Sequence, residues 1–259
     1  MIKESISVII PTFNSSQTIH RAIDSVLKQT YRPNEIIVID DASTDGTISI
    51  VEKIIESNRH ASIKLLRNSK NSGPSISRNK GIEISEGEWI AFLDSDDSWH
   101  PQKLQIQLEL AQEHECCFIG TLFGIQTSFT PISRQKPIMV KTLTKSSFLW
   151  KNYFSTPTVL IKKNSLLLFN SEMKYAEDFD LWTKMIHHLE KAILIQENLV
   201  SLGSPPFMGE GLSSKLFQME RGELKVLRNE RQISLRFLAM AFSLLKFSRR
   251  LIIKFFSLL

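Results

Sequence analysis

The stretch Trp89-Ile90-Ala91-Phe92-Leu93-Asp94-Ser95-Asp96-Asp97-Ser98-Trp99 joins a short apolar run to three carboxylates within four positions. The run is too short and too aromatic for a helix, so it predicts a buried strand whose carboxyl end carries several negative charges. Carboxylates this close repel one another unless a cation lies between them. Oxygen ligands suit Mg²⁺ or Mn²⁺ better than zinc. The alternative from the same residues is an acidic helix cap in solvent.

Three strand–helix units precede this strand. The predicted strands cover residues 6–10, 35–39 and 63–66. The predicted helices are one with an apolar face from Ile19 to Leu27, one at about 47–57 and one that ends near Gly87. Pro11 is expected to end the first strand because it cannot donate to a ladder, and the first helix should end near Pro33. Regular alternation of strands and helices predicts an α/β fold with a mostly parallel central sheet and right-handed crossovers.

The polar loops that follow these strands lie at one edge of such a sheet. Open parallel sheets bind ligands beyond the carboxyl ends of their strands. We therefore expect polar residues from four loops to converge there: Thr12 and Asn14, Asp40 and Asp41, Arg78 and Asn79, and Asp94 to Asp97. This convergence favours a binding site over a simple helix cap.

A second acidic motif, Glu177-Asp178-Phe179-Asp180, opens a predicted helix. Acidic residues suit the positive end of the helix dipole, so plain helix-terminal acidity is the alternative to a functional role. Between the two acidic motifs, the sequence predicts a helix to about Glu113 and strands at 116–119, 138–140 and 158–161. A glycine-rich loop at 202–211 is expected to form a lid.

Composition places the chain among ordinary globular proteins, with 259 residues, 42% hydrophobic and 23% charged. The net charge of +5 is unevenly distributed. Residues 221–259 carry nine basic and two acidic residues, whereas residues 1–220 carry 23 basic and 25 acidic ones. No charged, apolar and cleavage regions of a secretory leader precede the first strand, so we expect a cytoplasmic protein.

The segment from Ile233 to Leu259 alternates apolar clusters with basic side chains. Its longest run without charge, Phe237 to Leu245, is shorter than the ~20 residues that span a bilayer. A basic and strongly apolar helix can lie in the membrane interface on anionic lipid, and we expect this role for residues 221–259. The alternative is a helix that packs on the rest of the chain or on a second copy.

Five motifs in this order resemble glycosyltransferase family 2, and the resemblance covers about residues 5–200. They are Val8-Ile9-Ile10-Pro11-Thr12-Phe13-Asn14, Ile39-Asp40-Asp41-Ala42-Ser43-Thr44-Asp45-Gly46-Thr47, Arg78-Asn79-Lys80-Gly81, Phe92-Leu93-Asp94-Ser95-Asp96-Asp97 and Glu177-Asp178-Phe179-Asp180-Leu181-Trp182. Each motif alone is weakly specific, whereas all five in order form a strong signal. The resemblance implies the GT-A fold and a nucleotide-sugar donor.

The resemblance also implies which residues bind that donor. Base and ribose would contact Thr12 and Asp41, and Arg78 would approach the base or the diphosphate. The remaining implied donor contacts are Pro11, Asn14, Asp94 and Asp96.

The family's D-x-D pair is formed here by Asp94 and Asp96, with Asp97 beside it. The pair is implied to place Mn²⁺ or Mg²⁺ on the diphosphate, and either Asp96 or Asp97 is the direct metal ligand. Asp178 matches the catalytic base of family members that invert the anomeric centre. The candidate acceptor contacts are Trp99 and Glu177, with core packing as the alternative for the tryptophan.

We therefore predict an inverting, metal-dependent glycosyltransferase of surface polysaccharide synthesis, similar to bacterial O-antigen and capsule enzymes. The donor is a nucleotide sugar, UDP-glucose first and UDP-galactose second, and the acceptor is a sugar on an undecaprenyl-diphosphate carrier. Residues 1–220 are predicted to form the GT-A domain, with a nucleotide-sugar half at 1–100 and an acceptor half at 101–220. The tail at 221–259 would bind the inner face of the cytoplasmic membrane, and no nucleic acid partner is expected.

Two other kinds of protein are compatible with parts of the sequence. A phosphoryl-transfer or phosphatase-type enzyme also places Asp-x-Asp after a strand, but it gives no role to Asp40-Asp41 or Glu177-Asp178. A non-catalytic nucleotide-sugar-binding subunit would not need every family position, and all are filled here. A dinucleotide-dependent oxidoreductase is disfavoured because Pro11-Thr12-Phe13-Asn14 stands where a G-x-G-x-x-G loop would follow the first strand.

Overall fold

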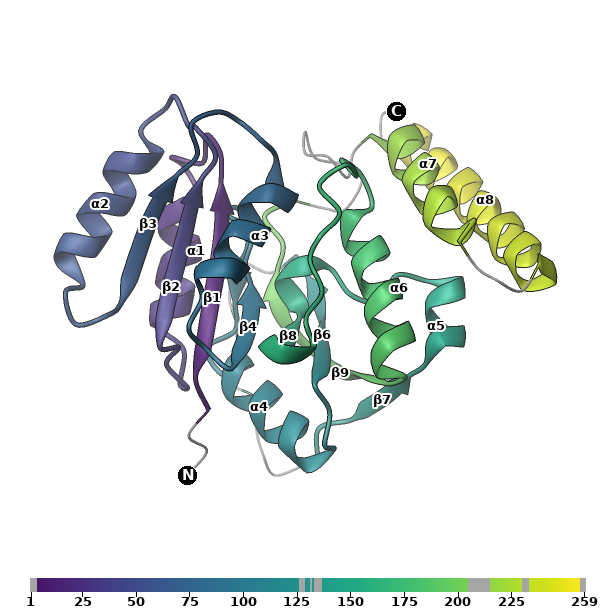
Figure 1. Cartoon of the computed structure of the whole chain (residues 1–259), viewed down its shortest axis with the longest axis horizontal. Coiled ribbons are helices and arrows are strands. Elements are labelled where there is room, and N and C mark those ends of the chain that lie inside the picture. The colour runs from purple at the N-terminus through teal and green to yellow at the C-terminus, as the bar shows by residue number, and fades with distance from the viewer. Residues whose placement is uncertain are drawn as a thin grey trace.

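A mixed β-sheet with helices on both faces runs through the chain (Figure 1). The computed structural model describes residues 4–125, 129–130, 132, 137–204, 215–229 and 233–256. In these ranges the sheet has nine strands, in the order β3-β2-β1-β4-β8-β6-β9-β5, with β7 paired to β9. Most of the loop that we predict to be a lid, residues 205–211, lies outside the described residues.

The first half of the sheet is parallel, as the sequence predicts. Its strands are β1 (Ile6–Thr12), β2 (Glu35–Asp40), β3 (Ile63–Arg67) and β4 (Trp89–Phe92), and its helices are α1 (Ile19–Leu27), α2 (Thr47–Ser57) and α3 (Pro74–Ile84). β1 lies between β2 and β4, and its apolar residues are buried on both faces because Val8 and Ile10 pack into one hydrophobic core and Ile9 into another. The carboxyl ends of β1, β2 and β4 therefore lie at the same edge of the sheet.

Three boundaries differ from the prediction. β1 continues through Pro11 to Thr12, because β4 pairs only with Ile6–Ile9 and no ladder needs the missing amide of Pro11 on that side. α1 ends at Leu27, since the Gln29 side chain donates to the carbonyls of Ser25 and His100 and turns the chain toward α4. α3 ends at Ile84, and Gly87 instead lies against the backbone of Ser7, where a side chain would not fit.

The second half of the sheet mixes parallel and antiparallel pairs. Its elements are β5 (Ser98–Trp99), α4 (Lys103–Glu113), β6 (Phe118–Gly124), β7 (Val140–Leu143), α5 (Lys145–Trp150), β8 (Leu160–Lys162), α6 (Glu177–Leu189) and β9 (Ala192–Ser201), with short 3₁₀ turns at Thr156–Thr158 and Lys163–Ser165. β8 runs antiparallel to β4 and β6, whereas β6 and β9 are parallel. α5 and β9 were not predicted.

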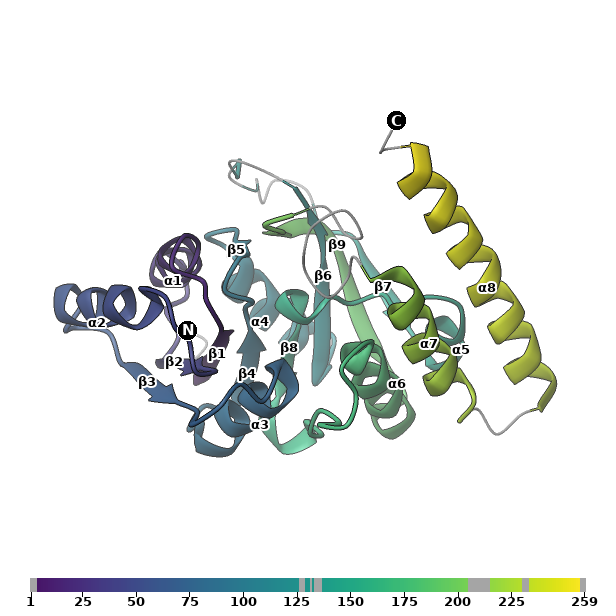
Figure 2. The ribbon, with the colours of Figure 1, turned by 90° about the horizontal axis from the view of Figure 1, so that it is seen from above.

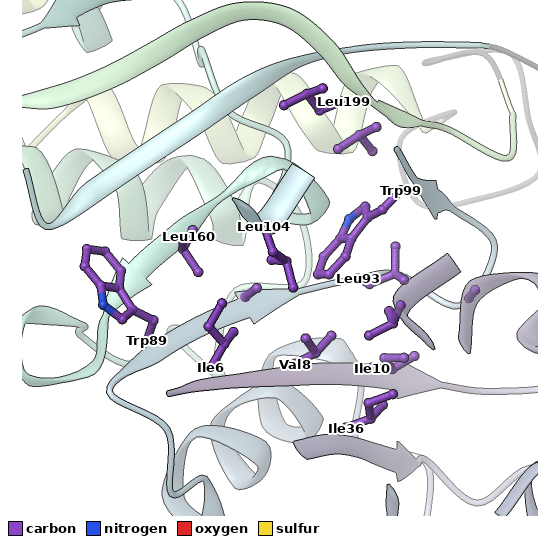
Figure 3. Close-up of a cluster of buried hydrophobic side chains, with 14 of the residues drawn as sticks. Ile6, Val8, Ile10, Ile36, Trp89, Leu93, Trp99, Leu104, Leu160 and Leu199 are labelled. Carbon is purple, nitrogen blue, oxygen red and sulfur yellow. The ribbon is translucent and has the colours of Figure 1, made fainter. Parts of the chain in front are cut away.

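Two hydrophobic cores lie on opposite faces of the sheet. The first packs β1, β2 and β4 against α1, α2 and α4, and Figure 3 shows Trp99 inside it with Val8, Leu93 and Leu104. The second packs the other face against α3, α5 and α6 around Phe118 and Trp182. Both acidic motifs are thus attached to rigid, packed elements rather than to free loops.

Two helices follow at the C-terminal end, α7 (Leu216–Leu227) and α8 (Ile233–Phe256). α7 lies between α6 and α8, and α8 is the outermost helix (Figure 2). α7 starts at Leu216 and so crosses the boundary that we predict at residue 220. Within the described ranges, no helix is long and apolar enough to cross a membrane.

Candidate active site

The two acidic motifs meet at Arg78, which reaches them from α3. Its Nη2 lies 2.7 Å from Oδ1 of Asp94, and its Nη1 lies 3.1 Å from Oε1 of Glu177, 99 residues away in sequence. The guanidinium is buried and packs over the ring of Phe169 at 5.2 Å. Burial by itself lowers the pKa of Arg78, but the two carboxylates outweigh it and hold the pKa above its ordinary value. Arg78 is therefore a permanent cation between two acidic loops.

Asp94 to Asp97 form a tight turn after β4. The amide of Asp97 donates to the carbonyl of Asp94 at 3.0 Å. Gly203, which follows β9, donates its amide to Oδ1 of Asp97 at 2.9 Å. A methyl group on Gly203 would overlap the main-chain carbonyl of Asp96. The contact with Gly203 thus fixes the turn, in which Asp97 is buried and Asp96 is exposed.

The charges in this turn destabilise one another. Burial and the neighbouring carboxylates of Asp94 and Asp96 raise the pKa of Asp97 well above its usual value. Partial desolvation and the charge of Asp94 raise the pKa of Asp96. A divalent cation would relieve this repulsion, and oxygen-only donors match Mg²⁺ or Mn²⁺.

No group of three or more His, Cys, Asp or Glu side chains is arranged to hold a metal ion among the described residues. Mg²⁺ usually binds one or two carboxylates and completes its coordination with phosphate oxygens and water. The turn fits a cation of that kind, shared with a diphosphate, better than a closed protein cage. Asp96 is the exposed carboxylate, whereas an oxygen of Asp97 already accepts the Gly203 amide.

Asp178 lies in the first turn of α6, beside Glu177. Its Oδ1 accepts the amide of Phe179 at 2.6 Å, and its Oδ2 accepts the side-chain amide of Asn152 at 3.1 Å. Burial and the charge of Glu177 raise the pKa of Asp178 to about 7, although the two hydrogen bonds and Arg78 oppose the rise. A carboxylate with a pKa near 7 is suited to accept a proton at physiological pH.

The loops after β1 and β2 form the other side of the site. Asp41 accepts hydrogen bonds from Asn68, from the Ser72 amide at 3.0 Å and from the Gly73 amide at 2.7 Å, so its carboxylate fixes the loop before α3. In the neighbouring strand ends, Oγ1 of Thr12 and Oδ1 of Asp40 are buried without a hydrogen-bond partner among the described residues. Unpartnered buried polar atoms are costly and point to a polar ligand at this edge.

Asn14 shapes the loop after β1, whereas Pro11 lies within β1 and pairs with Ile39 of β2. Asn14 has a φ of 49°, its amide donates to the Ser43 hydroxyl at 2.9 Å, and its Oδ1 accepts the Thr44 amide at 2.9 Å. Ser15 reaches the acidic turn, with its hydroxyl 2.7 Å from that of Ser95. The loops after β1, β2 and β4 are thus joined by hydrogen bonds.

The two candidate acceptor contacts lie in different surroundings. Glu177 is paired with Arg78 at the site, and its side chain is 13% exposed. Trp99 is 2% exposed, and its Nε1 donates to the carbonyl of Pro157 at 2.9 Å. Trp99 therefore packs in the core, the alternative that we kept for it, and has no open face for a sugar (Figure 3).

Sequence reasoning missed three residues that shape the site. Asn152 binds Asp178, Gly203 binds Asp97, and Arg21 donates from α1 to the main-chain carbonyl of Asp96. Asn152 and Arg21 belong to no local motif, and Gly203 lies in the predicted lid loop, where nothing in the sequence points to Asp97. Only the long-range pairing of β6, β8 and β9 brings the first two to the site, and one sequence carries no direct signal for it.

Comparison with known proteins identifies the family. The sequence model described as glycosyl transferase family 2 matches residues 7–175, which is more than half of the chain. The chain belongs to glycosyl transferase family 2. The matched residues include the first four motifs of this family 2 glycosyltransferase and end two residues before Glu177.

Relatives and solved structures agree with this assignment. WfgD of Escherichia coli, named UDP-Glc:alpha-D-GlcNAc-diphosphoundecaprenol beta-1,3-glucosyltransferase, is 32% identical over 181 residues, 70% of this chain and 69% of the relative. WfaP of Escherichia coli carries the same enzyme name and is 30% identical over 71% of this chain and 70% of its own. The crystal structure of S. aureus TarS 1-349 in complex with UDP matches 93% of this chain and 70% of that fragment, with 25% identity and a TM-score of 0.69. The fold is therefore GT-A.

Proposed function

We propose that this glycosyltransferase moves a hexose from a nucleotide sugar to a sugar on an undecaprenyl-diphosphate carrier, with inversion at the anomeric carbon. One observation carries the proposal: Arg78 joins the Asp94–Asp97 turn to Glu177, so that the acidic turn and the half-buried Asp178 next to Glu177 form one site. UDP-glucose is the first candidate donor and UDP-galactose the second. The names of WfgD and WfaP and the TarS complex with UDP support a UDP-sugar and a lipid-linked acceptor.

The donor would bind at the carboxyl edge of β1, β2 and β4. Pro11, Thr12, Asn14 and Asp41 form the part of this edge that we assign to the nucleotide, and the unpartnered hydroxyl of Thr12 supports it. Asp94 and Asp96 would hold Mn²⁺ or Mg²⁺, with Asp96 as the direct ligand and Asp97 as the residue that fixes the turn. When bound, the cation supplies positive charge to the departing diphosphate, an electrostatic effect worth several kcal/mol.

Asp178 would take the proton of the acceptor hydroxyl. A hydroxyl is a poor nucleophile until a base accepts its proton, and the base must lie on the face of the sugar opposite the leaving group. Asp178 lies on α6 next to Glu177, and Arg78 lies between Glu177 and Asp94 of the acidic turn, which suits separate roles for the two acidic motifs. Glu177 keeps the pKa of Asp178 high and is the remaining candidate acceptor contact.

We propose a division of the chain that follows the positions of the donor and acceptor residues. We assign residues 1–100 to the nucleotide sugar, residues 101–220 to the acceptor and residues 221–259 to a helical tail. The first four strands supply the donor edge, whereas Asn152 and Asp178 come from the second range.

We further propose that α8 lies on the inner face of the cytoplasmic membrane. Its charged residues Lys246 and Arg250 face α7, where Arg250 lies 2.8 Å from Glu223. Its apolar side chains face outward, with exposures between 42% and 69%: Ile233, Phe237, Leu238, Phe242, Leu244, Leu245, Ile252 and Ile253. Arg249 is exposed on the same helix. An outward surface that combines apolar side chains with a basic one needs an apolar partner, and the lipid carrier of the acceptor favours an anionic bilayer.

A donor screen tests the proposed function. The full chain is incubated with each common sugar nucleotide, a GlcNAc-diphosphate-lipid analogue and Mn²⁺ or Mg²⁺, and nucleotide release is measured. We expect acceptor-dependent release from one UDP-hexose, and loss of that release with EDTA. No release from any sugar nucleotide would overturn the proposal. Phosphatase turnover without sugar transfer would favour the phosphoryl-transfer alternative.

A further inference from the structure

The residue before the second acidic motif has an unusual backbone conformation. Ala176 has a φ of 56°, in the left-handed region that residues with a side chain rarely adopt, and it is buried. Its carbonyl accepts the amide of Asp180 at 3.0 Å and so starts α6. A strained residue keeps such a conformation only where its surroundings hold it. The direction in which Asp178 points depends on this turn.

Gly222 on α7 is the neighbour that holds it. A side-chain carbon at Gly222 would lie 2.6 Å from the main-chain oxygen of Tyr175 and 3.1 Å from the Cβ of Ala176. The first contact is with backbone, which cannot rotate away as a side chain can. Glycine in the middle of a helix weakens that helix. Its presence in α7 is therefore better explained by the close approach of α7 to Tyr175 and Ala176 than by a contribution to helix stability.

We propose that Gly222 is a positioning residue: the backbone of α7 presses against the Tyr175–Ala176 turn and fixes the orientation of Asp178. This inference rests on the proposed role of Asp178 as base. Gly222 lies outside residues 7–175, the range that the family model matches, so α7 contributes to the site from beyond that range. Glu223, the next residue, pairs with Arg250 of α8 and braces α7 from its other side.

Gly222→Ala tests the proposal in the full chain. Alanine favours helices, so at an ordinary helix position this change would stabilise the protein. Here we expect kcat for transfer to fall about 100-fold, the size of effect that a misplaced catalytic group produces. The KM for the donor and the melting temperature should stay close to wild type. Arg221→Ala, on the exposed side of the same helix, is the matched control and should keep the wild-type kcat.

Two further readouts separate positioning from a general loss of structure. The pH at which kcat is half-maximal should change in Gly222→Ala, because the carboxylate loses its fixed relation to Asn152 and Glu177. Amide hydrogen exchange should become faster over residues 177–180 and stay unchanged over the rest of α6. The exchange readout does not need transfer activity, so a wild-type chain that transfers no sugar would defeat the proposed function while leaving this inference measurable.

Ala176→Gly is a second variant for the case in which Gly222→Ala folds poorly. Glycine accepts a φ of 56° without strain and introduces no clash, but it removes the methyl group that α7 contacts. We expect kcat to fall several-fold with an unchanged melting temperature. A wild-type kcat and wild-type exchange at residues 177–180 in the folded variants would overturn the proposal. Equal losses of kcat, donor binding and melting temperature in both would overturn it as well.

Discussion

Asp178 combines burial with a hydrogen-bonded, fixed carboxylate, and the combination has a consequence for pH dependence. Its pKa is raised to about 7, so the group is protonated below that pH and cannot accept the proton of an acceptor hydroxyl. We therefore expect kcat to fall as the pH decreases through about 7 and to level off above it. A pH profile of kcat from pH 5 to 9 checks this. A kcat that stays constant down to pH 5 would argue against Asp178 as the base.

The same residue gives a direct test by substitution. Asp178→Asn keeps an oxygen for the Phe179 amide but removes the ability to accept a proton. Because base catalysis contributes roughly 10²–10⁴-fold, we expect transfer to fall by that factor while the affinity for UDP, measured by calorimetry, stays the same. Near-normal turnover would remove Asp178 from this role.

Asp96 and Asp97 are adjacent in sequence but differ in their surroundings. Asp96 is exposed, whereas Asp97 is buried against Gly203. Asp96→Ala should weaken the metal-dependent binding of UDP by at least the roughly 10–100-fold that the loss of an outer-shell partner costs, because it removes the proposed direct ligand. Asp97→Asn keeps an acceptor for the Gly203 amide and should bind UDP and Mn²⁺ nearly as wild type does. Calorimetry with and without Mn²⁺ compares the two, and the reverse result would make Asp97 the ligand.

Among the helices and strands, the sequence predicts those that are specified by a local residue pattern. The four parallel strands and α1, α2 and α3 follow from apolar runs, helical periodicity and acidic strand ends, and all are present. α5 and β9 were missed because their place depends on partners far away in sequence. β9 pairs with β6 through shifts in register, and Gln196-Glu197-Asn198 interrupts its apolar pattern.

In the candidate site, too, the sequence predicts the residues that belong to local motifs and misses those that depend on long-range contacts. Asp94, Asp178 and Arg78 were identified from their motifs, but the role of Arg78 as the bridge between the motifs was not, because no local pattern places α3 beside α6. Asn152 lies in an unremarkable stretch, and Gly203 lies in the glycine-rich loop that we predict to be a lid, but the sequence links neither of them to the acidic motifs. Trp99 was a candidate acceptor contact because it is next to the acidic motif, but it only packs in the hydrophobic core.

α8 is the element whose surface gives the clearest prediction. Replacing Phe237, Leu238 and Leu245 with serine should weaken binding to vesicles of anionic phospholipid by about tenfold per residue, because each loses roughly 1.5 kcal/mol of apolar burial. Leu168→Ser, an exposed leucine away from α8, is the matched control and should bind as wild type does. Flotation with such vesicles measures the effect. Equal membrane binding by the triple variant, or by a chain truncated at Gln232, would contradict the proposal.

Across the whole molecule, the charge count of the sequence overstates the attraction of the tail to anionic lipid. Residues 221–259 carry an excess of seven positive charges. However, Lys246 and Arg250 face the acids of α7, where neighbouring Glu220 and Glu223 are buried. Membrane binding by α8 should therefore depend less on salt than nine free positive charges would suggest, because Lys246 and Arg250 are already paired with acidic residues of α7.

Arg78 joins the Asp94–Asp97 turn after β4 to Glu177 at the start of α6, where the proposed base Asp178 also lies. The central claim is a transfer in which Asp178 activates the acceptor from the face opposite the diphosphate. The most direct measurement is the stereochemistry of the product, by ¹H NMR, after incubation with UDP-α-glucose, Mn²⁺ and the GlcNAc-diphosphate-lipid analogue. The account predicts a β-linked glucose, recognised by its large H1–H2 coupling. An α-linked product would contradict it.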